Sequence, residues 1–193
     1  MARRETVVAM VAAALAAGLA VGAAGALLRR GRGSDAQPLA AEAIDDHLRV
    51  LATAHPLAVE TGDPHALKPW LSGQLDFSPA VPTASESGLV LRGATVGYVF
   101  DRKAAVLLYR LRLHLVTLLA FRAEGLPWPA GGQRAGAAPR LAKLSERGFH
   151  AVLWRSSGLG YALVSDSDPA ELAGLAGALA AGTTGEGAAG AAP

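Results

Sequence analysis

The stretch from Thr6 to Leu28 places the strongest limit on this chain, because it contains no charged residue. Basic residues stand close to both of its ends, at Arg3, Arg4, Arg29, Arg30 and Arg32. At a rise of about 1.5 Å per residue, a helix of this length reaches roughly 34 Å, which exceeds a hydrocarbon core of about 30 Å. The sequence therefore predicts a single N-terminal transmembrane helix over 6–28, preceded by a short cytoplasmic segment, 1–5.

A cleavable signal peptide is the alternative for the same stretch. Arg3 and Arg4 would form its basic n-region, and Ala24-Gly25-Ala26 resembles a small-x-small cleavage site. The apolar run is longer than the roughly 7 to 15 residues of an h-region, which favours the anchor. In an anchor, the spacing of Gly18 and Gly22 would allow two helices to approach closely, so a homodimer is one candidate assembly.

Beyond the span, charges, prolines and glycines interrupt short apolar runs, as in a compact domain. We expect a tether over 29–38, one α+β domain over 39–179 and a disordered Ala/Gly-rich tail over 180–193. The net charge of +2 comes from mixed charges without a basic stripe, which argues against nucleic acid as a partner. Cysteine is absent, which excludes disulfides and thiol chemistry.

Helical periodicity is clear at both ends of this domain. Ile44, Leu48 and Leu51 share one face of a predicted helix over 39–53, with Asp46 on another face. Near the C-terminus, Asp168 and Pro169 begin a predicted helix over 169–179. Between them, 57–61 reads as a short strand. One helical turn over 64–68 and a second from Pro69 to Gly73 follow, because proline is unfavourable inside a helix.

Alternating patterns predict hairpins in the rest of the domain. The segment from Leu89 leads into a turn at 101–103. Residues 105–121 are too many for one strand, so a turn or a bulge near 111–114 should divide them. Residues 122–143 read as a loop, and 149–155 and 161–165 form another hairpin. We therefore expect a mainly antiparallel sheet of about five strands, with the two long helices covering one face, Trp154 buried and Trp70 packed beside it.

Four segments in order resemble one bacterial family. They are HPLAVETGDPHALKPWLSGQLDF at 55–77, the strands at 106–121, GFHAVLW at 148–154 and GYALVSDSDPAELAGLAGAL at 160–179. The most specific part is Lys68-Pro69-Trp70 followed by Leu75-Asp76-Phe77. This pattern resembles the extracytoplasmic domain of bacterial transmembrane anti-sigma factors, a group of transmembrane transcriptional regulators.

The resemblance implies a sensor domain outside the inner membrane, which contacts protein partners in the envelope. Members of the family usually carry a cytoplasmic zinc-binding domain, with one His and two Cys ligands, before the span. This chain has five residues before Thr6 and no cysteine. We therefore expect it to represent the sensor half alone, with an indirect effect on transcription and no sigma-factor inhibition of its own.

Five residues are candidates for contacting a ligand or a partner. Lys68 and Trp70 flank Pro69 and would offer a cation and an aromatic wall. Arg110, Arg112 and His114 alternate with aliphatic residues, so they would form a cationic sheet face. The structural alternatives are a core tryptophan and an ordinary solvent-facing sheet surface. No paired metal-ligand spacing, phosphate loop or catalytic motif is present, so we expect no metal, no cofactor and no enzyme activity.

Two functions follow from these observations. The first is a membrane-anchored extracytoplasmic sensor or interaction module. The second is an exported periplasmic ligand-binding protein, with a cleaved signal peptide and a cleft near Lys68 and Trp70.

Overall fold

The computed structural model describes residues 36–128 and 139–186. In this part of the chain, seven strands form one antiparallel sheet in the order β1-β2-β3-β4-β7-β6-β5. The strands are β1 (Val59–Glu60), β2 (Leu89–Val99), β3 (Arg102–Leu111), β4 (His114–Arg122), β5 (Ala142–Glu146), β6 (Phe149–Ser156) and β7 (Leu159–Ser165). The helices are α2 (Gln37–Ala52), α3 (Pro64–Gln74) and α4 (Pro169–Glu186), with a short 3₁₀ helix, η1 (Ser85–Ser87).

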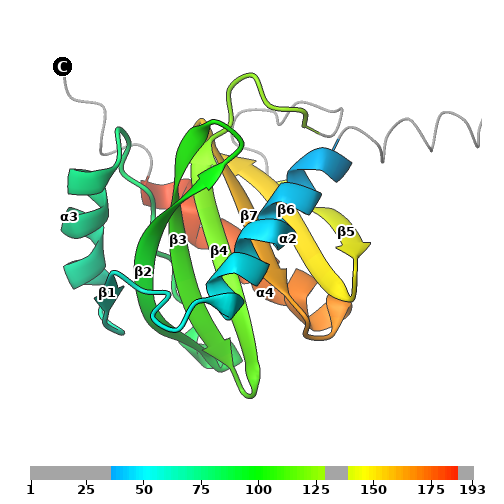
Figure 1. The fold of residues 1–193 in the computed structure, drawn as a ribbon, viewed down its shortest axis with the longest axis horizontal. Helices are drawn as coiled ribbons and strands as arrows, with labels where there is room; N and C mark the ends of the chain where they lie inside the picture. The colour runs from blue at the N-terminus through cyan, green and yellow to red at the C-terminus, as the bar shows by residue number, and fades with distance from the viewer. Residues whose placement is uncertain (1–35, 129–138, 187–193) are drawn as a thin grey trace, which may run out of the picture.

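The sheet carries helices on both faces, as Figure 1 shows. Helix α2 packs on one face, against a core that includes Val106, Leu119 and Leu153. Helices α3 and α4 pack on the other face, against Leu107, Leu118 and the fully buried Trp154 among others. The α+β class, the antiparallel pairing and the burial of Trp154 are confirmed. The expectation that both long helices cover one face is wrong, because both faces of the central strands are apolar.

Arg92 and Gly93 decide which side chains of β2 face each side of the sheet. The register with β3 shifts between Leu91 and Gly93, so β2 contains one extra residue, a β-bulge at Arg92. A Cβ on Gly93 would lie 2.1 Å from the carbonyl oxygen of Val59, so only glycine fits beside β1. Because of the bulge, Leu91 and Ala94 both face the α4 side, although they are three residues apart.

Several predicted boundaries differ from the structure. Helix α2 begins at Gln37, inside the predicted tether. Helix α3 is continuous through Pro69. Proline has no N–H group, so the carbonyl group of His65 lacks its helical hydrogen bond. Both residues are exposed, so water can solvate that carbonyl group. Strand β5 begins at Ala142, inside the predicted loop, and its Lys143 and Ser145 weaken the apolar signal.

The predicted disordered tail is also corrected in its first part, because α4 continues to Glu186. Ala180 and Thr183 are buried on this extension, and the Ser156 hydroxyl donates a hydrogen bond of 3.0 Å to the Thr183 carbonyl oxygen. These contacts with β6 come from residues distant in sequence. The small residues of the tail therefore extend the helix by packing closely on the sheet.

The predicted span 6–28, with Gly18 and Gly22, lies outside the described residues, as do 187–193 of the predicted tail. Among the helices in 36–128 and 139–186, none is both long enough and apolar enough to cross a bilayer.

Candidate functional site

Lys68 and Trp70 lie on α3, at the side of the sheet formed by β1 and β2. The Asp63 carboxylate caps the start of this helix by accepting the His65 N–H at 2.9 Å. Trp70 is partly buried and packs against the core on the α4 side of the sheet. A large part of its indole is therefore used in packing, and its role as a ligand wall stays a prediction.

The segment after α3 is held in place by Arg122 of β4. The Arg122 guanidinium donates to the Asp76 carboxylate at 2.8 Å and to the Asp76 carbonyl oxygen at 2.6 Å. It also lies over the Phe77 ring, 5.8 Å from the ring centre. The hydrogen bond from Arg122 holds the pKa of the Asp76 carboxyl group below its usual value. The Leu75-Asp76-Phe77 part of the sequence pattern therefore has a structural use, since it ties the end of α3 to the sheet.

Arg110, Arg112 and His114 are brought to one end of the sheet, around the turn between β3 and β4. Arg112 lies in the turn itself and forms an ion pair with Glu171 of α4. The His114 Nδ1 atom lies 2.8 Å from a carboxylate oxygen of Asp166. The predicted cationic face is not formed, because Arg112 lies in the turn rather than on a strand, and Arg112 and His114 each have an acidic neighbour.

Arg110 differs from the other two, because it is exposed among apolar side chains. Val90 and Leu115 stand directly opposite it on the neighbouring strands. Val90 is 48% exposed, Leu113 at the adjacent turn is 98% exposed, and Leu115 is partly buried. We call Val90, Arg110, Leu113 and Leu115 the Arg110 surface.

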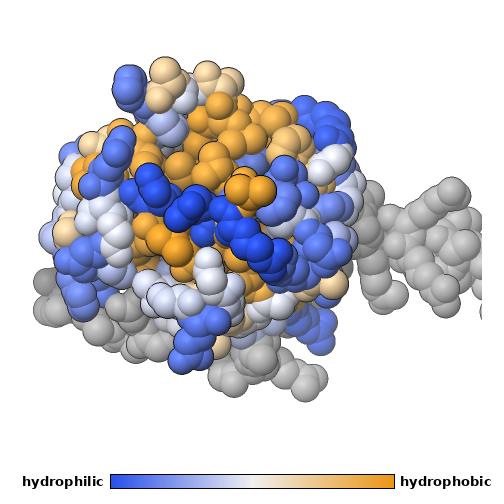
Figure 2. Space-filling view, turned by 90° about the horizontal axis from the view of Figure 1, so that it is seen from below, coloured by the Kyte–Doolittle hydropathy of each residue, from blue (hydrophilic) through white to orange (hydrophobic). Residues whose placement is uncertain are grey.

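Figure 2 shows the end of the molecule where the β3–β4 turn lies, with apolar surface on both sides of a hydrophilic band. This mixture of exposed aliphatic groups and arginine is typical of protein interfaces, where arginine is enriched and aliphatic groups supply buried area. The Arg110 surface can therefore contact another macromolecule without any rearrangement of the fold.

A buried polar cluster lies beneath α2. His47 is 1% exposed, and its Nδ1 atom shares a hydrogen bond of 2.7 Å with the Thr117 hydroxyl of β4. Its ring also makes an edge contact with Phe149, at 5.3 Å between ring centres. Burial lowers the pKa of His47 to about 4, so the imidazole is neutral at pH 7.

Asp46, the neighbour of His47, is also buried. One carboxylate oxygen pairs with Arg49, whereas the other has no hydrogen-bond partner in the described part of the chain. Burial raises the pKa of this carboxyl group, against the lowering effect of Arg49. A Cβ at Gly97 would lie 3.2 Å from the Asp46 Oδ1 atom, so the absence of a side chain at Gly97 makes room for the carboxylate.

Sequence reasoning placed Asp46 on a polar face and did not single out His47. The helical spacing of Ala40, Ala43, His47 and Val50, all buried, was the available signal. It was weak because two alanines give little hydropathy contrast. Leu51, which was assigned to the buried stripe, is 42% exposed at the C-terminal end of α2.

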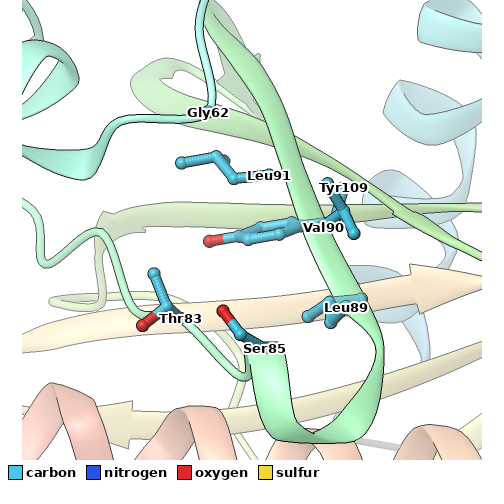
Figure 3. Close-up of a pocket in the computed structure, with 7 residues that line it drawn as sticks. All are labelled: Gly62, Thr83, Ser85, Leu89, Val90, Leu91 and Tyr109. Carbon is cyan, nitrogen blue, oxygen red and sulfur yellow. The ribbon is translucent and has the colours of Figure 1, made fainter.

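A small pocket of about 160 Å³ lies between β2 and the segment before it, as Figure 3 shows. Its lining consists of Gly62, Thr83, Ser85, Leu89, Val90, Leu91 and Tyr109. The Tyr109 hydroxyl donates to the Pro82 carbonyl oxygen at 2.8 Å, so its hydrogen is already used. Ligand pockets usually measure roughly 300 to 1,000 Å³. The pocket therefore suits a single side chain of a partner better than a metabolite, and neither Lys68 nor Trp70 lines it.

Within the described residues, no group of three or more His, Asp or Glu side chains is placed to hold a metal ion. The buried Asp46 and His47 do not line the pocket beside β2. No protein-family model, curated protein or solved structure matches the chain.

Proposed function

We propose that this chain is a membrane-anchored interaction module, whose α+β domain lies outside the inner membrane and contacts another protein of the envelope. The observation that carries the proposal is the Arg110 surface, where Leu113 and Val90 are exposed beside a guanidinium. Exposed aliphatic groups clustered at one end of a domain are characteristic of contact sites. The anchor is Thr6 to Leu28, which eight residues separate from the start of α2.

The resemblance to the sensor domain of transmembrane anti-sigma factors supports the same role. In this proposal the domain reports envelope conditions, and its effect on a sigma factor is indirect, through its partner. The most specific part of that resemblance also has a structural role. The contacts of Arg122 with Asp76 and Phe77 fix the end of α3 to the sheet.

Fusions after Pro193 test the topology. Alkaline phosphatase fused there should be active, because it folds only outside the cytoplasm. A fluorescent protein that matures only in the cytoplasm, fused at the same site, should be dark. Fusions to a chain lacking 6–28 serve as the control and should give the reverse pattern. Active fluorescence with inactive phosphatase in the full chain would contradict the proposal.

An exported ligand-binding protein with a cleaved signal is the second candidate, and its site would be the pocket beside β2, whose size admits a group no larger than a single side chain. The mass of the mature protein separates the two. A chain that retains Thr6 to Leu28 and remains in the membrane fraction after a carbonate wash is an anchor. A shortened chain that is released into the periplasmic fraction is an exported binding protein.

A further inference from the structure

Arg110 and Arg92 differ from most other arginines of the domain in their electrostatic surroundings. Five arginines pair with carboxylates, at Arg49, Arg102, Arg112, Arg122 and Arg147. For Arg110 and Arg92, no carboxylate of the described residues lies within ion-pair distance. Both are exposed, and Arg92 lies two residues after Val90, the cross-strand neighbour of Arg110. This part of the surface therefore carries uncompensated positive charge.

Apolar side chains surround these two charges on the same end of the sheet. Val90 and Leu115 stand on either side of Arg110, and Leu113 projects from the next turn. The nearby acidic residues Glu171 and Asp166 are engaged by Arg112 and His114. We propose that the Arg110 surface, together with Arg92, binds a segment of a partner protein that combines aliphatic or aromatic side chains with Asp or Glu.

The position of α2 favours a protein over a lipid surface as the occupant, and this step rests on the proposed membrane anchor. Helix α2 has 16 residues, about 24 Å of helix at 1.5 Å per residue, and its N-terminal end is the end nearest the span in sequence. The Phe100 N–H, just beyond the end of β2 opposite to Val90, donates a hydrogen bond to the carboxylate of Glu42 in the N-terminal half of α2. The Arg110 surface therefore lies towards the C-terminal end of α2, which is the end farther from the proposed membrane anchor.

The chemistry of the interface follows from the two kinds of group. The guanidinium groups donate paired hydrogen bonds to carboxylates and so select the sign of the partner's charge. The leucine and valine side chains supply apolar area, which raises affinity without selecting charge. Discrimination between acidic and basic partners should therefore depend on Arg110 and Arg92, and the residual affinity should depend on Val90 and Leu113.

A charge-swap experiment tests this assignment with the full chain in an uncharged detergent. The probes are two amphipathic peptides with identical Leu and Phe positions, one with Glu and one with Lys at every polar position, followed by fluorescence anisotropy. We expect the Glu peptide to bind at least tenfold more tightly than the Lys peptide. Arg92→Glu with Arg110→Glu should reverse this preference, whereas Lys143→Glu, an exposed cation on β5, should leave it unchanged.

Three results would overturn the proposal. The first is equal or absent binding of the two peptides. The second is a preference that Arg110→Glu does not alter, although the melting temperature of the variant equals that of the wild type. The third is Arg110-dependent binding to phosphatidylglycerol vesicles without peptide binding, which would assign the surface to lipid. The assay does not depend on topology, so failure of the phosphatase test leaves its result interpretable.

Discussion

The two faces of the sheet are built differently, although both are covered by helices. On the α4 side, Trp154 and Tyr161 stack with ring centres 5.3 Å apart, and Leu172, Leu175 and Leu179 of the helix cover the same apolar layer. On the α2 side, Ala40 and Ala43 bring the helix close, Asp46 and His47 are buried, and the apolar layer continues into the exposed Arg110 surface.

Because of this difference, the two faces contribute unequally to the stability of the domain. Burying aromatic and aliphatic groups is favourable, whereas burying a carboxyl group and an imidazole is unfavourable unless their hydrogen bonds are replaced. The α4 side makes the larger contribution to the free energy of unfolding. We expect the α2 side to contribute less, because one buried carboxylate oxygen of Asp46 has no hydrogen-bond partner among the described residues.

The largest expected effect is on the α4 side. Trp154→Ala should lower the free energy of unfolding by about 3 to 5 kcal/mol, because it removes a fully buried indole and its stack with Tyr161. Urea denaturation, followed by circular dichroism, measures the change. Leu113→Ala is the matched control and should change stability by less than about 0.5 kcal/mol, since that side chain is 98% exposed. Similar losses for both variants would refute the assigned burial.

The α2 side should dominate the acid dependence of stability. The pKa of His47 falls from 6.5 to about 4 on folding, so the unfolded chain binds more protons between these values. Stability from this group is complete above pH 6.5 and is lost as the pH falls towards 4, by about 3 kcal/mol. His47→Gln, which retains a hydrogen-bonding side chain for Thr117, should remove this dependence in denaturation curves between pH 6.5 and 4. An unchanged dependence would contradict the burial of a neutral imidazole.

Asp46 should act with the opposite sign, which sharpens the comparison. Its pKa is raised on folding, so its stabilising contribution is present below its unfolded pKa of 3.8 and is lost as the pH rises through the folded value. The wild type should therefore lose part of its free energy of unfolding as the pH rises above 3.8, and Asp46→Asn should not show this decrease. The double variant with His47→Gln should show neither trend. A profile for Asp46→Asn that matches the wild type would refute the desolvation of this carboxyl group.

A smaller effect is expected at the extension of α4. Trp154 Nε1 donates to the Thr183 hydroxyl at 3.4 Å, and that hydroxyl donates to the Ala180 carbonyl oxygen at 2.8 Å. Thr183→Val keeps the shape but leaves the indole N–H unsatisfied, at a cost of about 1 to 3 kcal/mol. Thr183→Ser keeps the hydroxyl and is the control. Equal melting temperatures for the wild type and Thr183→Val would show that this contact contributes nothing.

The smallest effect should come from the ion pair between Arg112 and Glu171, which links the β3–β4 turn to α4. Arg112 is largely exposed, so solvent screens the pair and a double-mutant cycle should give about 0.2 to 1 kcal/mol. The cycle uses Arg112→Ala, Glu171→Ala and the double variant in low salt. A coupling free energy above this range, or one that is unchanged in molar salt, would show that the pair is less exposed to solvent than the structure indicates.

The sequence was sufficient for features that depend on local pattern. Asp168 and Pro169 mark the start of α4, and the alternation over 105–121 predicts two strands divided near 111–114, where the structure has its turn. The features that were missed depend on distant contacts. The alanines of α2 gave no sign of which neighbours they would bury, so Asp46 was assigned to solvent. The extension of α4 beyond Leu179 depends on Ser156 and Trp154, which stand far away in the chain.

The candidate residues show the same limit. Alternation placed Arg110 and Arg112 on one side of a strand, but it did not identify Glu171 as the partner of Arg112 or Val90 as the neighbour of Arg110. Pairing across strands decides which arginine is compensated. That information arises only when the sheet forms.

The bulge at Arg92 has a consequence for changes in chain length. Leu91 pairs with Tyr109 and Gly93 pairs with Leu108, so Arg92 is the extra residue relative to β3. Its deletion should leave the pairs with β3 in register and remove only the hydrogen bond from the Thr61 N–H to the Arg92 carbonyl oxygen. Deletion of Thr95 instead would move the residues on one side of it to the opposite face of the sheet. We therefore expect a chain without Arg92 to keep a cooperative melting transition, and a chain without Thr95 to lose it. Arg92 is then a position where the chain can become one residue shorter, with the loss of a charge beside the Arg110 surface, while the core stays in place.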